Sequence, residues 1–213
     1  RLRSIRIRSG FERWACTWDT VDEARIDAVV AAAQRDGTAH TPTLVAPAYQ
    51  AWVGRPDAPV RPRSDLMPGW YRRLWGRAFY TDKPNAREAA GRMLARQFDV
   101  VRRLHTAGVP IFAGTDVFVD YVVPGASLHD ELKLFVRAGF TPAEALAAAT
   151  WVPSRTLRVS GLGIVAAGNP ADLSIFRQDP TVDLAHLDSL ESVVVDGRHY
   201  HQNQLAALHA QQI

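Results

Sequence analysis

The segment VPIFAGTD, residues 109–116, constrains the fold more than any other part of the sequence. Five mostly apolar residues, too few for a helix, end at a glycine and an acid, a pattern typical of a strand buried on both faces of a sheet. Amphipathic helices are predicted on either side, over 86–107 and 127–138, and this order favours an α/β fold with parallel strands. Asp116 would then lie at the carboxyl end of the sheet, where the active sites of barrels and open α/β sheets are found.

One helix and one short strand are predicted before this segment. The helix covers residues 19–36, with Asp19 or Thr20 as its cap and Gly37 at its end. Residues 38–46 contain the threonine and apolar side chains of a strand, although the proline among them favours a strand end or edge.

The connection over residues 47–85 is rich in proline, arginine and tryptophan and predicts no more than a short helix near 70–79. Long irregular connections in compact domains are usually lids or mobile segments. Its aromatic side chains either pack a lid onto the domain or form a small-molecule binding surface; they are Trp52, Trp70, Trp75 and Tyr80.

Beyond residue 126 the sequence predicts two helices and then a small β unit. Ser127 is the expected N-cap of the helix over 127–138, in which Glu131 is expected only to complement the helix dipole. Thr141 caps the next helix. Short strands with glycine and asparagine turns follow, starting with a predicted hairpin over 161–168.

Composition excludes several classes of protein. The chain has 213 residues and a net charge of +3, without a dense basic stripe, so no nucleic-acid partner is expected. The single cysteine, Cys16, excludes an internal disulfide and a cysteine-cluster zinc site. No apolar run approaches the roughly 20 residues that span a bilayer, so we expect no membrane partner and favour a soluble, cytoplasmic protein. The first residues lack an initiator methionine and a signal core and are typical of the interior of a longer chain.

Four groups of polar side chains are candidates for chemistry. Asp116 is either an active-site carboxylate or the cap of a turn. His129, at the start of a predicted helix, points either to solvent or into the site that Asp116 faces. His40 is either a strand-edge residue or a ligand, and His199 and His201 are a weak candidate for a metal-binding pair.

Six segments keep the order and spacing of one known family. They are PTL (42–44), AGVPIFAGTD (107–116), PGASLHDELKLFVRAGFTPAEALAAAT (124–150), GNPADLSIF (168–176), DP (179–180) and VVVDGR (193–198). Together they resemble the C-terminal half of a metal-dependent amidohydrolase of the imidazolonepropionase- and prolidase-like type.

The resemblance implies a particular α/β architecture. Residues 1–155 would form part of a (β/α)8 TIM-type barrel, with 38–46 as its seventh strand and 109–116 as its eighth. Residues 156–200 would form part of a small β-sandwich, followed by a tail over 201–213. Two strands cannot close a barrel, so the rest would come from a longer protein, a partner chain or another copy in a homo-oligomer.

The resemblance also implies a chemistry. It makes Asp116 the eighth-strand aspartate, which lies at the metal and carries a proton from the attacking water, and it places His129 on the substrate side. The implied cofactor is one or two divalent ions, with zinc favoured, and the implied substrate is a small molecule. A divalent ion lowers the pKa of water to roughly 7 and polarises the carbonyl, while a nearby carboxylate moves the proton.

The sequence departs from this family pattern at the metal ligands. No His-x-His pair precedes the barrel segment, and neither Lys83 nor Lys133 suits a metal-bridging strand. Arg13 stands where the sixth-strand histidine is expected, and a guanidinium has no lone pair to donate to a metal. Either the ligand is lost, which we favour, or the register of the match is shifted here. We therefore expect metal-dependent hydrolysis of a non-peptide carbon–nitrogen bond, in an amide or cyclic amide, but not by these residues alone. The alternative is a catalytically dead remnant or interaction subunit that needs a partner chain.

Overall fold

The computed structural model describes residues 10–52, 55–75, 84–117 and 119–210. Its helices are α1 (Gly10–Thr17), α2 (Glu23–Asp36), α3 (Val45–Trp52), α4 (Gly69–Arg72), α5 (Pro84–Thr106), α6 (Ala126–Arg137), α7 (Pro142–Ala148), α8 (Trp151–Thr156) and α9 (Gln202–Ala210). Its 3-10 helices are η1 (Trp18–Thr20), η2 (Ser64–Leu66) and η3 (Leu184–Ser189), and its strands are β1 (Leu173–Phe176), β2 (Leu190–Val195) and β3 (Arg198–His201). Within these residues, no helix combines the length and the apolar character needed to cross a membrane.

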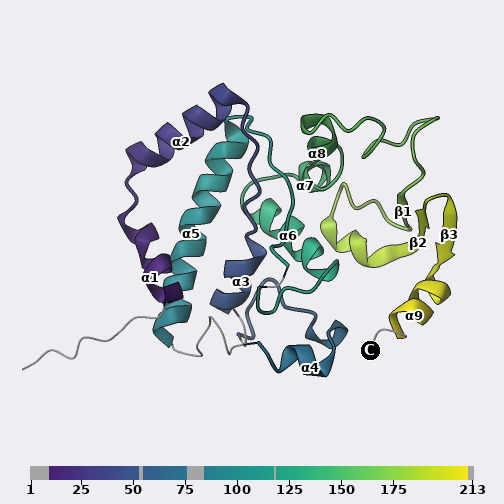
Figure 1. The fold of residues 1–213 in the computed structure, drawn as a ribbon, viewed down its shortest axis with the longest axis horizontal. Coiled ribbons are helices and arrows are strands. Elements are labelled where there is room, and N and C mark those ends of the chain that lie inside the picture. The colour runs from purple at the N-terminus through teal and green to yellow at the C-terminus, as the bar shows by residue number, and fades with distance from the viewer. Residues whose placement is uncertain (1–9, 53–54, 76–83, 118, 211–213) are drawn as a thin grey trace, which may run out of the picture.

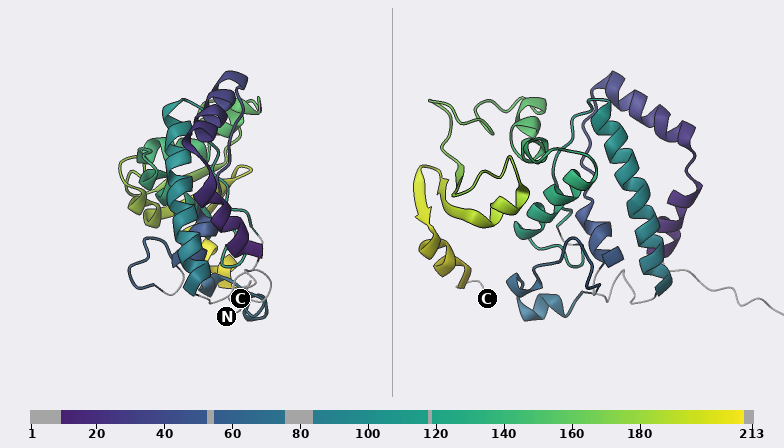
Figure 2. Two further views of the ribbon diagram at one scale, coloured as in Figure 1. Left: turned by 90° about the vertical axis from the view of Figure 1, so that its left-hand side faces the viewer. Right: turned by 180° about the vertical axis from the view of Figure 1, so that it is seen from behind.

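The long helix α5 organises one end of the molecule. Helices α1 and α2 lie along one side of α5, and α3 and α6 lie on the other (Figure 1). The sheet and α9 form the opposite end, and the view from behind shows the same order (Figure 2).

Helix α5 confirms the helix predicted over 86–107. Its buried side chains recur at helical spacing, and it ends before Gly108, whose φ of 74° is left-handed. Those side chains are Ala89, Ala90, Met93, Leu94, Val101 and Leu104. These side chains pack against α1 and α3, so α5 contributes to the core on both sides.

Helix α2 is also confirmed, but its predicted cap is wrong. Asp19 and Thr20 belong to η1, and the carboxylate of Asp22 accepts the N-terminal hydrogen bond, 2.7 Å from the Arg25 amide nitrogen. Gly37 ends the helix with a φ of 63°, as predicted. The helix starts three to four residues later than predicted, because Asp19 and Thr20 form a separate 3-10 turn.

Ion pairs hold α2 against α5, since Ile26 is the one buried residue of α2. Arg96 lies 2.6 Å from the Glu23 carboxylate, and Arg103 lies 2.9 Å from the Asp27 carboxylate. The hydrogen bond from Arg96, followed by that from Arg103, lowers the pKa of Glu23. These pairs are largely exposed, so they orient α2 more than they stabilise the fold.

The two predicted parallel strands meet in a single bridge, between His40 and Ile111. The His40 amide donates to the Pro110 carbonyl, and the Phe112 amide donates to the His40 carbonyl, both at 2.9 Å. The parallel direction is confirmed, but the strand over 38–46 is wrong beyond its first residues because α3 begins at Val45. The connection after residue 46 is likewise less irregular than predicted.

Gly114 lets the chain segments that follow this bridge approach closely. A Cβ atom at Gly114 would lie 2.5 Å from Cγ2 of Thr41, well inside the contact distance of two carbon atoms. Because Gly114 has no side chain, the two segments can touch just beyond the His40–Ile111 bridge.

The variant Gly114→Ala is expected to lower the free energy of unfolding by about 1 kcal/mol or more, because Thr41 or the backbone must shift. The matched control is Gly91→Ala in α5, where nothing lies within 4 Å of the added methyl group and alanine is expected to stabilise the helix. Urea denaturation of both variants tests this, and adding Thr41→Ser should restore stability to Gly114→Ala. Equal stabilisation by both alanines would contradict the proposed contact.

The C-terminal part contains the predicted β unit. Helix α7 begins with a complete capping box between Thr141 and Glu144, as its sequence predicted. The predicted hairpin over 161–168 is wrong, because these residues form turns without strand pairing. The following strands make an antiparallel sheet in the order β1–β2–β3.

Candidate active site

The carboxyl ends of the bridged segments form the candidate site, which we call the strand-end site and define as residues 41–43 and 114–116. It follows His40 on one segment and Ile111 on the other. Thr43 has a φ of 49° and Asp116 a φ of 54°, both in the left-handed region. Such backbone is unusual for a β-branched residue, and strained residues of this kind cluster at functional sites.

Asp116 is exposed at the strand-end site. Its backbone carbonyl accepts a hydrogen bond from the Val119 amide at 3.2 Å, which starts the turn after the segment. The turn role and the active-site role of Asp116 are therefore compatible, since the first uses the backbone and leaves the carboxylate accessible.

A buried carboxylate fixes the other half of the strand-end site. Glu131 of α6 has no exposed surface. Its two carboxylate oxygens accept hydrogen bonds from the amides of Leu44 and Val45, at 3.0 and 2.7 Å. These amides begin α3 directly after Thr43, so Glu131 caps α3 from a helix far along the chain.

Burial raises the pKa of Glu131 to about 8, while the hydrogen bonds from Val45 and Leu44 oppose this shift. The expectation that Glu131 only complements a helix dipole is therefore wrong. The position of Glu131 along the helix indicated that it is buried. It lies three and four residues before Leu134 and Phe135, which are fully buried. An acid on the apolar face of a helix needs a partner in the core.

A second polar contact joins α3 to α6. The hydroxyl of Tyr49 lies 2.7 Å from Oδ2 of Asp130 and 3.2 Å from Oγ of Ser127. Ser127 is not the N-cap of α6, a position that Gly125 occupies; its Oγ accepts a hydrogen bond from the Val123 amide inside the protein. Packing against α3 therefore decided the role of this serine.

The two histidines expected near the site are both exposed. Desolvation by the surrounding protein nevertheless lowers the pKa of the His40 imidazole. Desolvation also lowers the pKa of His129, and the positive charge of Lys133 acts in the same direction, against Asp188 and Asp130. The charges that act on His129 thus come from α6 and η3, so its placement on the substrate side remains a prediction.

The residues discussed where the sequence departs from the family pattern of metal ligands lie in different parts of the chain. Arg13 belongs to α1, with its side chain outside the described part of the chain, and Lys83 and Tyr80 also lie outside the described residues. Lys133 lies on α6, 3.3 Å from Asp130, and not on a strand.

A catalytic divalent ion does not fit the residues of the strand-end site alone. Among the described residues, no group of three or more histidine, cysteine, aspartate and glutamate side chains could hold a metal ion. One exposed carboxylate cannot supply the three or four protein ligands that zinc takes. Asp116 could therefore be one ligand or a proton carrier, but not a metal site alone.

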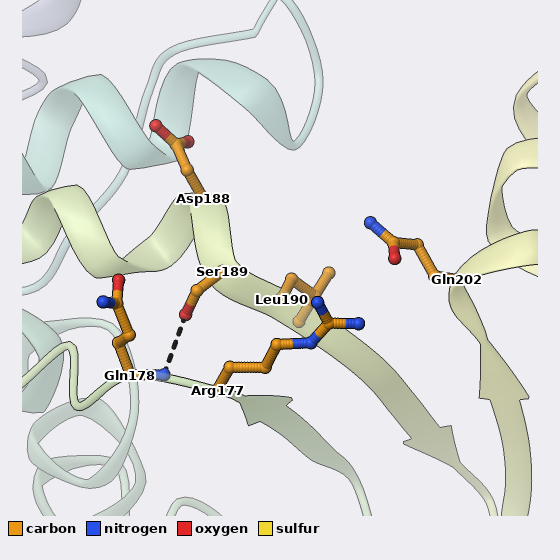
Figure 3. A pocket seen from close by; sticks show the side chains of 6 residues that line it. All are labelled: Arg177, Gln178, Asp188, Ser189, Leu190 and Gln202. Carbon is orange, nitrogen blue, oxygen red and sulfur yellow. Dashed lines mark hydrogen bonds between the residues drawn. The ribbon is translucent and has the colours of Figure 1, made fainter.

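The C-terminal unit contains a separate hollow of about 320 Å³ (Figure 3). Its lining is mostly polar: Arg177, Gln178, Asp188, Ser189, Leu190 and Gln202. Oγ of Ser189 accepts a hydrogen bond from the backbone amide of Gln178 at 3.0 Å. This bond connects η3 to the segment that follows β1. This hollow belongs to the sheet and η3 and is distinct from the strand-end site.

The sequence matches a known family over most of its length. The family model described as "Amidohydrolase family" matches residues 65–199. An imidazolonepropionase from Anaeromyxobacter is 33% identical over 122 residues, which cover 54% of this chain.

Solved structures share the fold. A structure titled "AH, Bottromycin amidohydrolase" matches 92% of this chain and 45% of its own, with 26% identity and a TM-score of 0.67. A Xaa-Pro dipeptidase matches 85% of this chain and 38% of its own, with 23% identity and a TM-score of 0.59, which shows the fold alone. The matched segments cover only 28% and 32% of two curated relatives, so this chain spans about a third of their length.

Proposed function

Because the chain belongs to the amidohydrolase family, we propose that it supplies the C-terminal part of an enzyme that hydrolyses a non-peptide carbon–nitrogen bond. The observation that carries the proposal is the position of Asp116. It is an accessible carboxylate that follows the parallel His40–Ile111 bridge and has left-handed backbone. Amides and cyclic amides of small molecules are the proposed substrates.

The proposed architecture extends the family fold to this chain. Residues 1–155 form a segment of a (β/α)8 barrel, residues 156–200 form part of a β-sandwich, and residues 201–213 form a tail that contains the last residue of β3 and helix α9. The proposed enzyme is metal-dependent, with zinc favoured, and its further ligands come from outside the described residues. A longer protein, a partner chain or a second copy of this chain would bring them.

Asp116 has one task in this proposal, which is proton transfer. An amide carbon is a poor electrophile and neutral water a poor nucleophile, so hydrolysis needs a base for the attack and an acid for the leaving nitrogen. The carboxylate of Asp116 accepts the proton of the water and returns it to the nitrogen as the bond breaks. His129, beyond the loop that follows Asp116, is the proposed substrate contact.

A second candidate function, that of an interaction subunit, rests on the metal-ligand set of the described residues. The described residues hold no group of three or more histidine, cysteine, aspartate and glutamate side chains for an ion, which favours a non-catalytic interaction subunit that keeps the fold. Such a subunit would pair through the incomplete sheet around the His40–Ile111 bridge.

The two functions are separated by an assembly experiment. The chain is purified alone and together with an N-terminal barrel half of an amidohydrolase that carries His-x-His, each with zinc, and is assayed on N-acyl amino acids and an imidazolone. We expect no turnover from the chain alone and turnover from the assembly. In the assembly, Asp116→Asn should reduce turnover roughly 100-fold or more.

The control variant is Asp36→Asn, which changes an exposed aspartate at the end of α2 and should leave turnover unchanged. Turnover that survives Asp116→Asn would contradict the assigned proton transfer. An assembly that binds zinc at one equivalent but does not turn over any substrate would favour the interaction subunit.

A further inference from the structure

The last strand of the sheet carries two histidines that the proposed function does not use. His199 and His201 are two positions apart on β3, so both side chains point to the same face of the sheet. Their ring centroids are 4.1 Å apart, with the ring planes inclined by 50°. Both side chains are exposed, so an ion can reach them from solvent.

The spacing of the rings suits one metal ion. Zinc–imidazole bonds are about 2.0–2.1 Å long, so two nitrogens of a tetrahedral ion are roughly 3.3 Å apart. Rings whose centroids are 4.1 Å apart reach this separation by small side-chain rotations.

The backbone under the two rings is fixed. His199 pairs with Val194 and His201 pairs with Ser192 in the antiparallel register of β2 and β3. The His201 amide also donates to Oε1 of Gln204 at 2.9 Å, at the start of α9. This edge strand, paired with β2 and tied to Gln204, keeps the two imidazoles on one face before any ion binds, which lowers the entropy cost of binding.

The strand positions opposite the histidines carry no positive charge. On this face of the sheet the residues opposite the histidines are Val194 and Ser192, and the next strand places Leu173 and Ile175 beyond them. Helix α9 packs on β2 and β3 and has no lysine or arginine. Arg198, the cation nearest in sequence, alternates to the opposite face together with Tyr200.

We propose that His199 and His201 chelate one divalent ion of the first transition row, with water completing its coordination. Imidazole pairs favour Cu²⁺, Ni²⁺ and Zn²⁺ and do not suit Mg²⁺ or Ca²⁺, which take oxygen ligands. The site lies in the C-terminal sheet, apart from Asp116, and it does not depend on the proposed hydrolase function.

Calorimetric titration of the whole 213-residue chain tests the site with ZnCl2, NiCl2 and MgCl2. The titrations use the Asp116→Asn background, so that an ion at the strand-end site does not contribute. We expect one zinc or nickel ion per chain and no heat from magnesium. Either His199→Ala or His201→Ala should weaken zinc binding by roughly tenfold or more, because the second contact of a chelate is intramolecular.

Two controls decide the interpretation. The double variant with His199→Ala and Tyr200→His keeps two histidines in β3 but places them on opposite faces, and it should bind zinc as weakly as His199→Ala. The variant His186→Gln removes a histidine from η3 and should leave the affinity unchanged. Circular dichroism confirms that each variant is folded. Equal affinity of the parent and His199→Ala, or full affinity in the opposite-face variant, would overturn the proposal.

Discussion

Replacing Glu131 by alanine is expected to lower the free energy of unfolding by about 3–5 kcal/mol. The change removes the two carboxylate oxygens that accept hydrogen bonds from the backbone amides of Leu44 and Val45. Each unsatisfied buried donor costs about 1–3 kcal/mol, and the lost side chain also leaves a cavity. Urea denaturation gives the free energy, and Glu88→Gln on the exposed face of α5 is the control, with an expected effect within about 0.5 kcal/mol.

The isosteric variant Glu131→Gln gives this prediction a pH signature. The pKa of Glu131 is about 8 in the fold against an ordinary value of 4.5. Below 4.5 the group is protonated in both states, so its contribution to stability is fully present. Between 4.5 and 8 the unfolded chain releases the proton and the native protein keeps it, so stability falls by up to ~1.4 kcal/mol per pH unit.

Glutamine cannot ionise, so the Glu131→Gln variant lacks this slope. We expect its penalty, relative to the parent protein, to be larger at pH 5 than at pH 8.5. The test is urea denaturation of both proteins at the two pH values. A penalty that instead grows with pH would show that the ionised carboxylate is the stable form in the fold and that its pKa is not raised.

Replacing Tyr49 by alanine is expected to cost about 3–5 kcal/mol, as is usual for a large buried aromatic side chain. Tyr49 is 1% exposed and packs between α3 and α6. Burial raises the pKa of its hydroxyl well above the ordinary value of 10, so the group donates to Asp130 at every accessible pH. Of the total, the hydroxyl should account for about 2 kcal/mol, because Asp130 is itself buried and a hydrogen bond to a carboxylate is strong.

A double-mutant cycle separates packing from the hydrogen bond. Tyr49→Phe and Asp130→Ala are measured singly and together by urea denaturation, with Tyr200→Phe on β3 as a control of similar chemistry. The double variant should be more stable than the sum of the single changes predicts, by about 1–2 kcal/mol. Strict additivity would mean that the short contact contributes no coupling energy.

Much of the helical structure could be predicted from local signals. Gly37, the capping box at Thr141 and the apolar spacing of α5 each act through neighbours within a few residues, so the sequence defines them without tertiary context. Capping choices were less secure. Ser127 has the chemistry of a cap, but its hydroxyl serves Val123 and Tyr49 instead.

The strand predicted over 38–46 failed for a long-range reason. Thr43, Leu44 and Val45 suit a strand by composition, and Pro47 argues against a helix except in its first turn. Helix α3 nevertheless starts at Val45, where Glu131, 86 and 87 residues away, accepts hydrogen bonds from the buried amides of Val45 and Leu44. Propensity cannot include an acceptor that distant.

The candidate site was also only partly present in the sequence. The acid after a short apolar segment predicted Asp116 at a strand end, and the family model covers this residue. Sequence order could not show that Gly114 brings the segment against Thr41, nor that Glu131 holds the opposite half of the site.

The sequence by itself determined the helices that end at local caps, the parallel order of the two segments and the position of Asp116 beyond one of them. Only the tertiary structure decided where α3 begins, which helical acid is buried, and that the rings of His199 and His201 lie 4.1 Å apart. The physical reason is range. Caps and periodicity act within one or two helical turns, whereas a buried carboxylate or a paired strand depends on groups that only the folded chain brings together.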